Sequence, residues 1–248
     1  MSELALPEVV GSLAWVERTG GRLTIGERLA LLLGAIPGLR DGFAMRRRAR
    51  KRDRPMPPLA ELEPPETPMV SAARAYVQQH AAPAMASHSF RTAFWTLRVL
   101  GLDGELTPEE RETAWVAALL HDVGLDVPPA RGDFTLGGVA VLKQLAHELG
   151  WRDEQVHAAS EAITTNLGTH VDRRLGRIAW AMNVGGIGEL GFGPHRGMMP
   201  KETIAALEAR FPRDGFRATA LRLIAAEAAR VPGGRFALFR PVFWLIMR

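Results

Sequence analysis

The chain has 248 residues, of which 47% are hydrophobic and 23% charged, as in globular proteins with a sizeable core. It contains no cysteine, which excludes disulfides, thiolate catalysis and cysteine-ligated zinc. The formal net charge is +4, but residues 46–54 alone carry seven basic side chains and one acidic one. The rest of the chain is therefore slightly acidic, which argues against a general nucleic-acid-binding surface.

The N-terminus gives no sign of export. Residues 1–10 include Glu3, Pro7 and Glu8 and have no basic start, so no signal peptide is predicted. No run of about 18 apolar residues is present, so no membrane-spanning helix is expected. Together with the absence of cysteine, this predicts a cytoplasmic protein.

Residues 1–68 are predicted to form a helical N-terminal extension with a connector. Thr24 and Glu27 have the spacing of a capping box, and the helix that they begin is expected to end at Pro37 and Gly38. Residues 43–68 turn basic and then proline-rich, which is typical of a semi-rigid extended connector.

The basic segment 46–54 is interpreted first as a solvated linker or helix end. Nucleic acid and anionic lipid headgroups are the alternative partners. No aromatic residues are interleaved with the basic ones, so nucleic acid is not expected.

Residues 69–232 are predicted to form the main domain, and the pattern is helical throughout. Helices are expected at 69–81, 84–100, 107–123, 135–149, 153–166, 173–182, 200–210 and 217–230. Gly101 and Gly150 are expected to end two of them, and glycines between 185 and 193 to interrupt the chain after another. No segment alternates with a period of two, which predicts an all-α fold.

Residues 233–248 form a strongly apolar tail that is too short to span a bilayer. The tail is expected to pack on the core or between subunits. Contact of residues 235–248 with a membrane surface is the alternative, because Arg235, Arg240 and Arg248 would suit it.

The strongest chemical signal is His121–Asp122, at the end of the helix expected at 107–123. Thr107 and Glu110 form a capping box at its start, and Gly124 suits a left-handed helix end. Burial of an ionised carboxylate is costly unless it is paired or binds a metal. A chance pair is the alternative, but His88 on the preceding helix could approach the same ion.

These residues resemble the HD superfamily of metal-dependent phosphohydrolases, and most closely its cyanamide-hydratase-like branch. The matching motifs are His88-Ser89-x-Arg91, residues 117–124, Asp133-Phe134 with Gly137-Gly138, Glu161-Ala162-Ile163 and residues 211–216. The resemblance covers about residues 80–230. It implies an HD-domain helical bundle with a divalent zinc, manganese or iron ion.

The resemblance also assigns roles to single residues. His88, His121 and Asp122 match the family's metal ligands, and Asp122 would take part in catalysis. Arg91 would orient the substrate or neutralise Asp122. The remaining family ligand, an aspartate, falls at Gly188, with Glu189 one residue away as a tentative replacement.

A second departure lies at Asn166, where cyanamide-hydratase-like relatives carry a histidine. Asn166 is a tentative substrate-binding residue, and His170 and Asp172 are nearby alternatives for the missing histidine. His147, His157 and His195 are expected on the surface. The oligomeric state does not follow from the sequence.

The predicted function is metal-dependent hydrolysis or hydration of a small molecule, either a phosphoester or a nitrile-like substrate. The alternative is a non-catalytic HD-fold binding or scaffold protein with an incomplete metal site and no ion. An iron oxygenase is a third and weaker alternative, because it needs more histidine ligands than the sequence offers.

Overall fold

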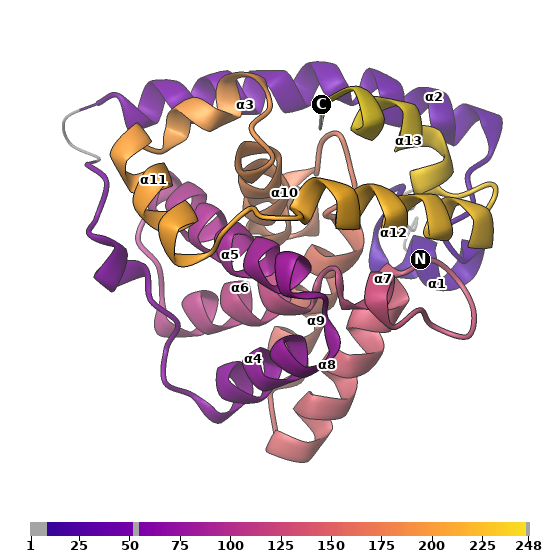
Figure 1. Cartoon of the computed structure of the whole chain (residues 1–248), viewed down its shortest axis with the longest axis horizontal. Coiled ribbons are helices and arrows are strands. Elements are labelled where there is room, and N and C mark those ends of the chain that lie inside the picture. Colours follow the sequence, from indigo (N-terminus) through magenta and orange to yellow (C-terminus); the bar gives the residue numbers. More distant parts are fainter. Residues whose placement is uncertain (1–8, 52–54, 247–248) are drawn as a thin grey trace, which may run out of the picture.

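The structure, a computed structural model, describes residues 9–51 and 55–246 (Figure 1). Across these ranges the chain folds into helices without a strand, and a single isolated bridge joins Arg22 to Gly234. This confirms the all-α fold. Among the described residues, no helix is both long and apolar enough to cross a membrane.

The helices follow one another with short connections. The elements are α1 (Leu13–Thr19), α2 (Ile25–Leu33), α3 (Ala35–Ala49), η1 (Leu59–Leu62), α4 (Pro68–His80), α5 (Pro83–Asp103), α6 (Pro108–Leu120), α7 (Val123–Asp126), α8 (Thr135–Leu149), α9 (Asp153–Thr165), η2 (Arg173–Leu175), α10 (Arg177–Glu189), η3 (Gly193–Met198), α11 (Lys201–Arg210), α12 (Phe216–Arg230) and α13 (Arg235–Ile246).

Helix α5 lies at the centre and is buried along most of its length. Helix α10 packs closely along it, and its glycines make this possible. A Cβ on Gly185 would lie 2.8 Å from the backbone nitrogen of Thr96, so only glycine allows this approach. The predicted interruption at Gly185 is therefore wrong, because these glycines continue α10 and serve helix packing.

Two helix ends differ from the prediction. Helix α5 passes Gly101 and ends at Asp103. Helix α6 ends at Leu120, and Gly124 does not take the left-handed conformation expected of it. Gly124 instead lies in α7, where a Cβ would come within 1.8 Å of the carbonyl oxygen of Phe134.

The N-terminal helices also continue further than expected. The capping box of Thr24 and Glu27 begins α2 as predicted. The expected end at Pro37 and Gly38 is wrong, because Pro37 stands in the first turn of α3, where its missing N–H is not needed. Helix α3 thus includes residues 46–49 of the basic segment, and residues 52–54 lie outside the described residues.

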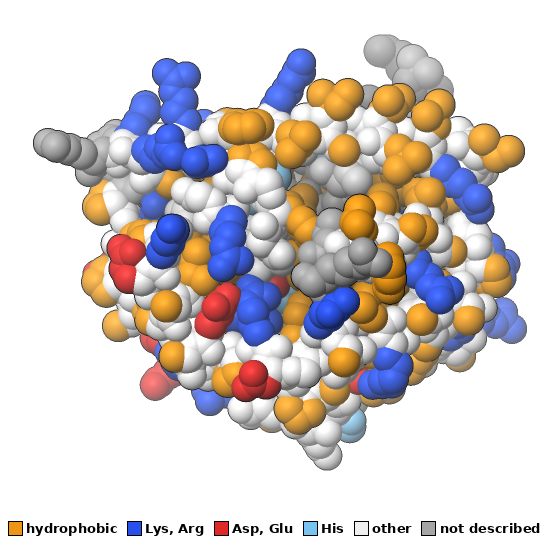
Figure 2. All heavy atoms as spheres, turned by 45° about the horizontal axis from the view of Figure 1, so that its top comes forward, with side chains coloured by type: hydrophobic (Ala, Val, Ile, Leu, Met, Phe, Trp, Pro, Cys, Tyr) orange, Lys and Arg blue, Asp and Glu red, His pale blue; other side chains and the backbone are white. Residues whose placement is uncertain are grey.

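Helices α2, α3 and α13 lie along one side of the molecule (Figure 1). Phe236 and Phe239 of α13 are buried, as expected for a tail that packs on the core. Val242, Trp244 and Leu245 are about half exposed. Hydrophobic side chains consequently appear on the surface of this side (Figure 2).

Candidate metal centre

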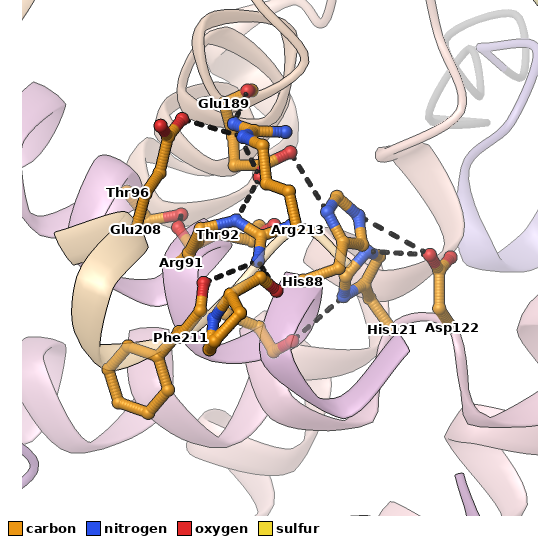
Figure 3. A network of polar contacts seen from close by, with 12 residues as sticks. His88, Arg91, Thr92, Thr96, His121, Asp122, Glu189, Glu208, Phe211 and Arg213 are labelled. Atoms are coloured by element: carbon orange, nitrogen blue, oxygen red, sulfur yellow. Dashed lines mark hydrogen bonds and ion pairs between the residues drawn. The ribbon is translucent and has the colours of Figure 1, made fainter. Parts of the chain in front are cut away.

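Three potential metal ligands converge where α5 meets the end of α6 (Figure 3). His88 comes from α5, His121 caps α6 and Asp122 follows it. Nε2 of His88 lies 3.5 Å from Oδ2 of Asp122, and Nε2 of His121 lies 3.2 Å from the same oxygen. One ligand atom of each residue lies within 4.8 Å of the others, which is a separation that one ion could bridge.

Hydrogen bonds at the Nδ1 atoms of both histidines orient the rings so that their Nε2 atoms face Asp122. Nδ1 of His121 lies 2.8 Å from the carbonyl oxygen of Ala118, which can only accept a hydrogen bond. Nδ1 of His88 lies 2.9 Å from Oε2 of Glu189. Both contacts favour a proton on Nδ1, and the Nε2 atom of each ring faces Asp122.

Glu189 therefore contacts the side of the His88 ring that faces away from Asp122 and fixes the orientation of the ring. Its carboxylate contacts Nδ1 of His88, on the opposite side of the ring from Asp122, and lies outside the three-residue cluster. The tentative assignment of Glu189 as a metal ligand therefore stays a prediction, and this geometry favours a supporting role instead. Nε of Arg91 donates to Oε1 of Glu189 at 2.5 Å, and Arg213 lies 2.9 Å from the same oxygen. These contacts hold the carboxylate away from the metal position.

Arg91 is fully buried and does not line the cavity beside the cluster. Besides Glu189, its guanidinium donates to the backbone carbonyls of Phe211 and Pro212. The contact of Arg91 with substrate stays a prediction, although Arg91 does not line this cavity. The carboxylate that Arg91 pairs with is Glu189 and not Asp122, which the alternative had named.

The charges of the cluster follow from its burial and its partners. Burial raises the pKa of Glu189, but His88, Arg91 and Arg213 outweigh burial and lower it to about 2. Burial likewise opposes ionisation of Asp122, yet the neighbouring His121 and His88 lower its pKa. Burial disfavours protonated His121, but the Asp122 carboxylate outweighs burial and raises its pKa. A metal ion would take the place of that proton.

A cavity of about 370 Å³ opens beside the cluster, and His88, His121 and Asp122 form part of its wall. Small-molecule sites usually have volumes of about 300–1,000 Å³. Most of the other lining side chains are apolar and come from α2, α3, α12 and α13, and from residues 187–192. The centre therefore adjoins a site of suitable size for a largely apolar molecule.

Of the remaining predicted residues, Asn166 lines the cavity, while His170 and Asp172 lie outside it. The buried Oδ1 of Asn166 has no hydrogen-bond partner among the residues that the structure describes. His170 instead pairs with Asp41 at 3.2 Å, and Asp172 accepts a hydrogen bond from the backbone of Arg174. Neither joins the cluster. His195 is buried against α3, so its predicted surface position is wrong.

Two residues of the site have roles that the sequence did not reveal. Arg213 reaches Glu189 from the loop before α12, and Phe216 stacks on the His88 ring at 4.7 Å between centroids. Both belong to the 211–216 motif of the family resemblance. That motif marked the segment as important, but its contacts depend on how α12 folds back over α5.

The family model that matches the chain is the HD domain, over residues 85–206. This span includes His88, His121, Asp122 and Glu189, and no curated protein matches the chain. The matched segment is an HD domain, and this match supports the resemblance to the HD superfamily. The match does not support the cyanamide-hydratase-like branch within that superfamily.

Proposed function

We propose that the protein is a metal-dependent hydrolase that acts on a phosphoester at the His88–His121–Asp122 centre. One observation carries the proposal. Two imidazoles whose Nδ1 atoms are held by acceptors, and one carboxylate, point toward the same place in the wall of a cavity. Imidazole and carboxylate donors suit zinc, manganese or iron.

The chain's own residues prepare this centre. His88 and His121 would supply neutral nitrogen ligands, and Asp122 would supply an anionic oxygen. Glu189 fixes the ring orientation of His88, while Arg91 and Arg213 keep Glu189 ionised. A bound ion lowers the pKa of coordinated water and polarises the substrate, and three protein ligands leave room for both. The apolar walls would exclude bulk water from the reacting group.

Two alternatives remain as proposals. Hydration of a nitrile-like carbon, as in the cyanamide-hydratase-like branch, would use the same centre, with Asn166 facing the substrate from the cavity wall. A non-catalytic HD protein is favoured by Gly188, since no carboxylate stands where the family has its further aspartate. Asn166 therefore bears on the choice of substrate, and Gly188 on the choice between enzyme and binding protein.

Metal analysis of the purified protein tests the proposal. We expect about one equivalent of transition metal in the wild type and less than about a tenth of that in His121→Ala, because the variant lacks a ligand. A chelator should lower the thermal midpoint of the wild type but not that of His121→Ala. His147→Ala, an exposed residue of α8, is the matched control and should retain its metal.

The same preparations should be assayed with p-nitrophenyl phosphate esters. Wild-type hydrolysis that is abolished by chelator and restored by metal supports the hydrolase. A wild type that holds no metal and does not respond to chelator would leave the non-catalytic alternative.

A further inference from the structure

Helices α2 and α3 present a continuous apolar stripe to the outside. Its members recur every three or four residues, which places them on one helical face. They are Ile25, Leu29, Leu32, Leu33, Ile36, Leu39 and Phe43, and their exposed fractions range from 47% at Leu39 to 87% at Ile25. Gly34 keeps right-handed helical backbone angles between the two helices, so the stripe is not broken there.

The same helices turn small residues toward the core. A Cβ on Gly38 would lie 2.1 Å from the carbonyl oxygen of Thr169, and one on Gly42 would lie 2.5 Å from the His195 ring. At Gly38 and Gly42 the inner face has no room for a side chain, although Leu31 and Met45 are buried elsewhere on it. Burial within the described chain does not explain the stripe.

The charges beside the stripe are of one sign. Residues 22–51 contain two acids, and both are half-buried and paired with an indole: Glu27 accepts from Trp15, and Asp41 from Trp180. The exposed basic residues of the segment are Arg22, Arg28, Arg40, Arg47, Arg50 and Lys51. Figure 2 shows hydrophobic side chains gathered over this face, basic side chains at its borders, and acidic ones below and to the left.

The cavity opens on this face. Leu32, Leu39 and Val242 line the cavity and are also about half exposed, so they stand at its mouth. Two of them belong to the stripe, and Val242 belongs to α13. A molecule that enters the cavity by this route passes over apolar side chains before it reaches His88, His121 and Asp122.

We propose that this face rests on an anionic phospholipid membrane and that the cavity takes the apolar chain of a lipid from it. An apolar helix face flanked by arginines is the feature by which peripheral proteins lie in the membrane interface. The cavity's apolar walls suit a hydrocarbon chain, and its polar wall would meet the lipid's phosphoester. Of these statements, only the meeting of the phosphoester with the polar wall rests on the proposed function.

The charges favour a membrane over a second copy of the chain. In a symmetric dimer the same patch of both subunits meets itself, so the arginines around the stripe would face arginines. Like charges across an interface are unfavourable. Anionic headgroups would instead neutralise them, while the stripe enters the acyl boundary.

Vesicle co-sedimentation of the full chain tests the membrane face. The protein should bind vesicles of phosphatidylcholine with phosphatidylglycerol more tightly than vesicles of phosphatidylcholine alone. Leu29→Ser and Ile36→Ser, which do not line the cavity, should each weaken binding by about tenfold. Leu149→Ser, an exposed leucine at the end of α8 on the opposite side of the molecule, should bind like the wild type.

Titration with cis-parinaric acid, a fluorescent straight-chain fatty acid, tests the cavity. The wild type should bind it saturably at about one equivalent. Ala220→Trp fills the cavity from α12, and Leu39→Trp narrows the mouth without adding a buried group. Both should weaken binding by about tenfold or more, because the indole takes up space that the ligand's chain would fill, and the ligand buries less apolar area. Ala206→Trp, exposed on α11, is the control.

Three results would overturn the inference. They are equal binding of the wild type to neutral and anionic vesicles, unsaturable parinaric acid fluorescence, and a dimer that Leu29→Ser dissociates. Both experiments are run on chelator-treated protein. A missing metal would therefore remove the proposed hydrolase but leave the lipid result intact.

Discussion

Glu189 is a buried carboxylate with three basic partners, and its position explains why the site differs from the family pattern. One oxygen meets Arg91 and Arg213, and the other meets His88. Loss of one member of a buried ion pair typically costs about 3–5 kcal/mol, because the partner is left unpaired. Glu189 therefore supports His88 from the side of the ring opposite Asp122.

The neighbouring position, Gly188, is closed to a side chain. A Cβ there would lie 2.9 Å from the indole ring of Trp95 and 3.2 Å from Met198. We predict that Gly188→Asp, which restores the family residue, destabilises the protein by about 1–3 kcal/mol through overpacking. It should not raise the metal content. Urea denaturation and elemental analysis check both points, and a stable variant with a second equivalent of metal would contradict the argument.

The sequence predicted the residues of the cluster but not their supports. His88, His121 and Asp122 stand out because their types and order match a metal-binding family. The role of Glu189 could not be found in this way, since a shift of one residue on a helix turns the side chain by about 100°. Whether the Glu189 side chain then reaches the three-residue cluster or the far side of the His88 ring depends on how α10 lies against α5.

At the scale of elements, backbone contacts fix the turn that carries His121 and Asp122. A Cβ on Gly138 of α8 would lie 2.4 Å from the carbonyl oxygen of Leu120, and one on Gly137 would lie 2.8 Å from Gly124. Helix α8 thus begins directly against the end of α6 and against α7. The glycines at these positions set the place of the ligands.

We predict that Gly124→Ala destabilises the protein by about 3 kcal/mol, since its Cβ would meet the Phe134 backbone and not a side chain that can move away. Metal affinity should fall with it, because the turn at His121 must shift. Gly26→Ala is the control. It has open space around it in α2 and should be neutral or stabilising by about 1 kcal/mol. Equal denaturation midpoints for the two variants would refute the prediction.

The sequence predicted most helices but misjudged what glycine does within them. Gly150 ends α8 in the left-handed conformation, as predicted. Gly101, Gly124 and Gly185 were expected to end or interrupt helices and instead lie within them. Local pattern cannot separate these cases, because a glycine needed for close packing and one needed for a turn are the same residue in the sequence.

At the scale of the whole molecule, Asp103 joins the N-terminal helices to the rest. It pairs with Arg48 of α3, Arg173 of η2 and Arg177 of α10 at distances between 2.9 and 3.2 Å. Burial raises the pKa of Asp103, but these arginines outweigh burial and lower it to about 2. The sequence indicates a solvated linker or helix end for the basic segment, and residues 46–49 are the end of α3. Arg48 in addition pairs with Asp103, more than fifty residues away in the sequence.

Because the pKa of Asp103 is lower in the folded than in the unfolded chain, its ionisation stabilises the fold at every pH above the unfolded pKa, which is about 4. The gain is lost as the pH falls through about 2. We predict that Asp103→Asn costs about 2 kcal/mol of unfolding free energy at pH 7. The difference from the wild type should shrink between about pH 4 and pH 2. Urea denaturation over this range measures it, with the exposed Asp214→Asn as control. A difference independent of pH would contradict the prediction.

The contact between Gly42 and the His195 ring has a consequence for the order of events during synthesis. Helix α3 leaves the ribosome early, but the segment on which it rests is made roughly 150 residues later, or about 10–30 s at usual elongation rates. Arg48 of α3 can meet Asp103 of α5 well before that, but the part of α3 around Gly42 lacks its final partner during this time. Helix α3 is therefore expected to reach its final place only after η3 has been made, although it precedes η3 in the chain.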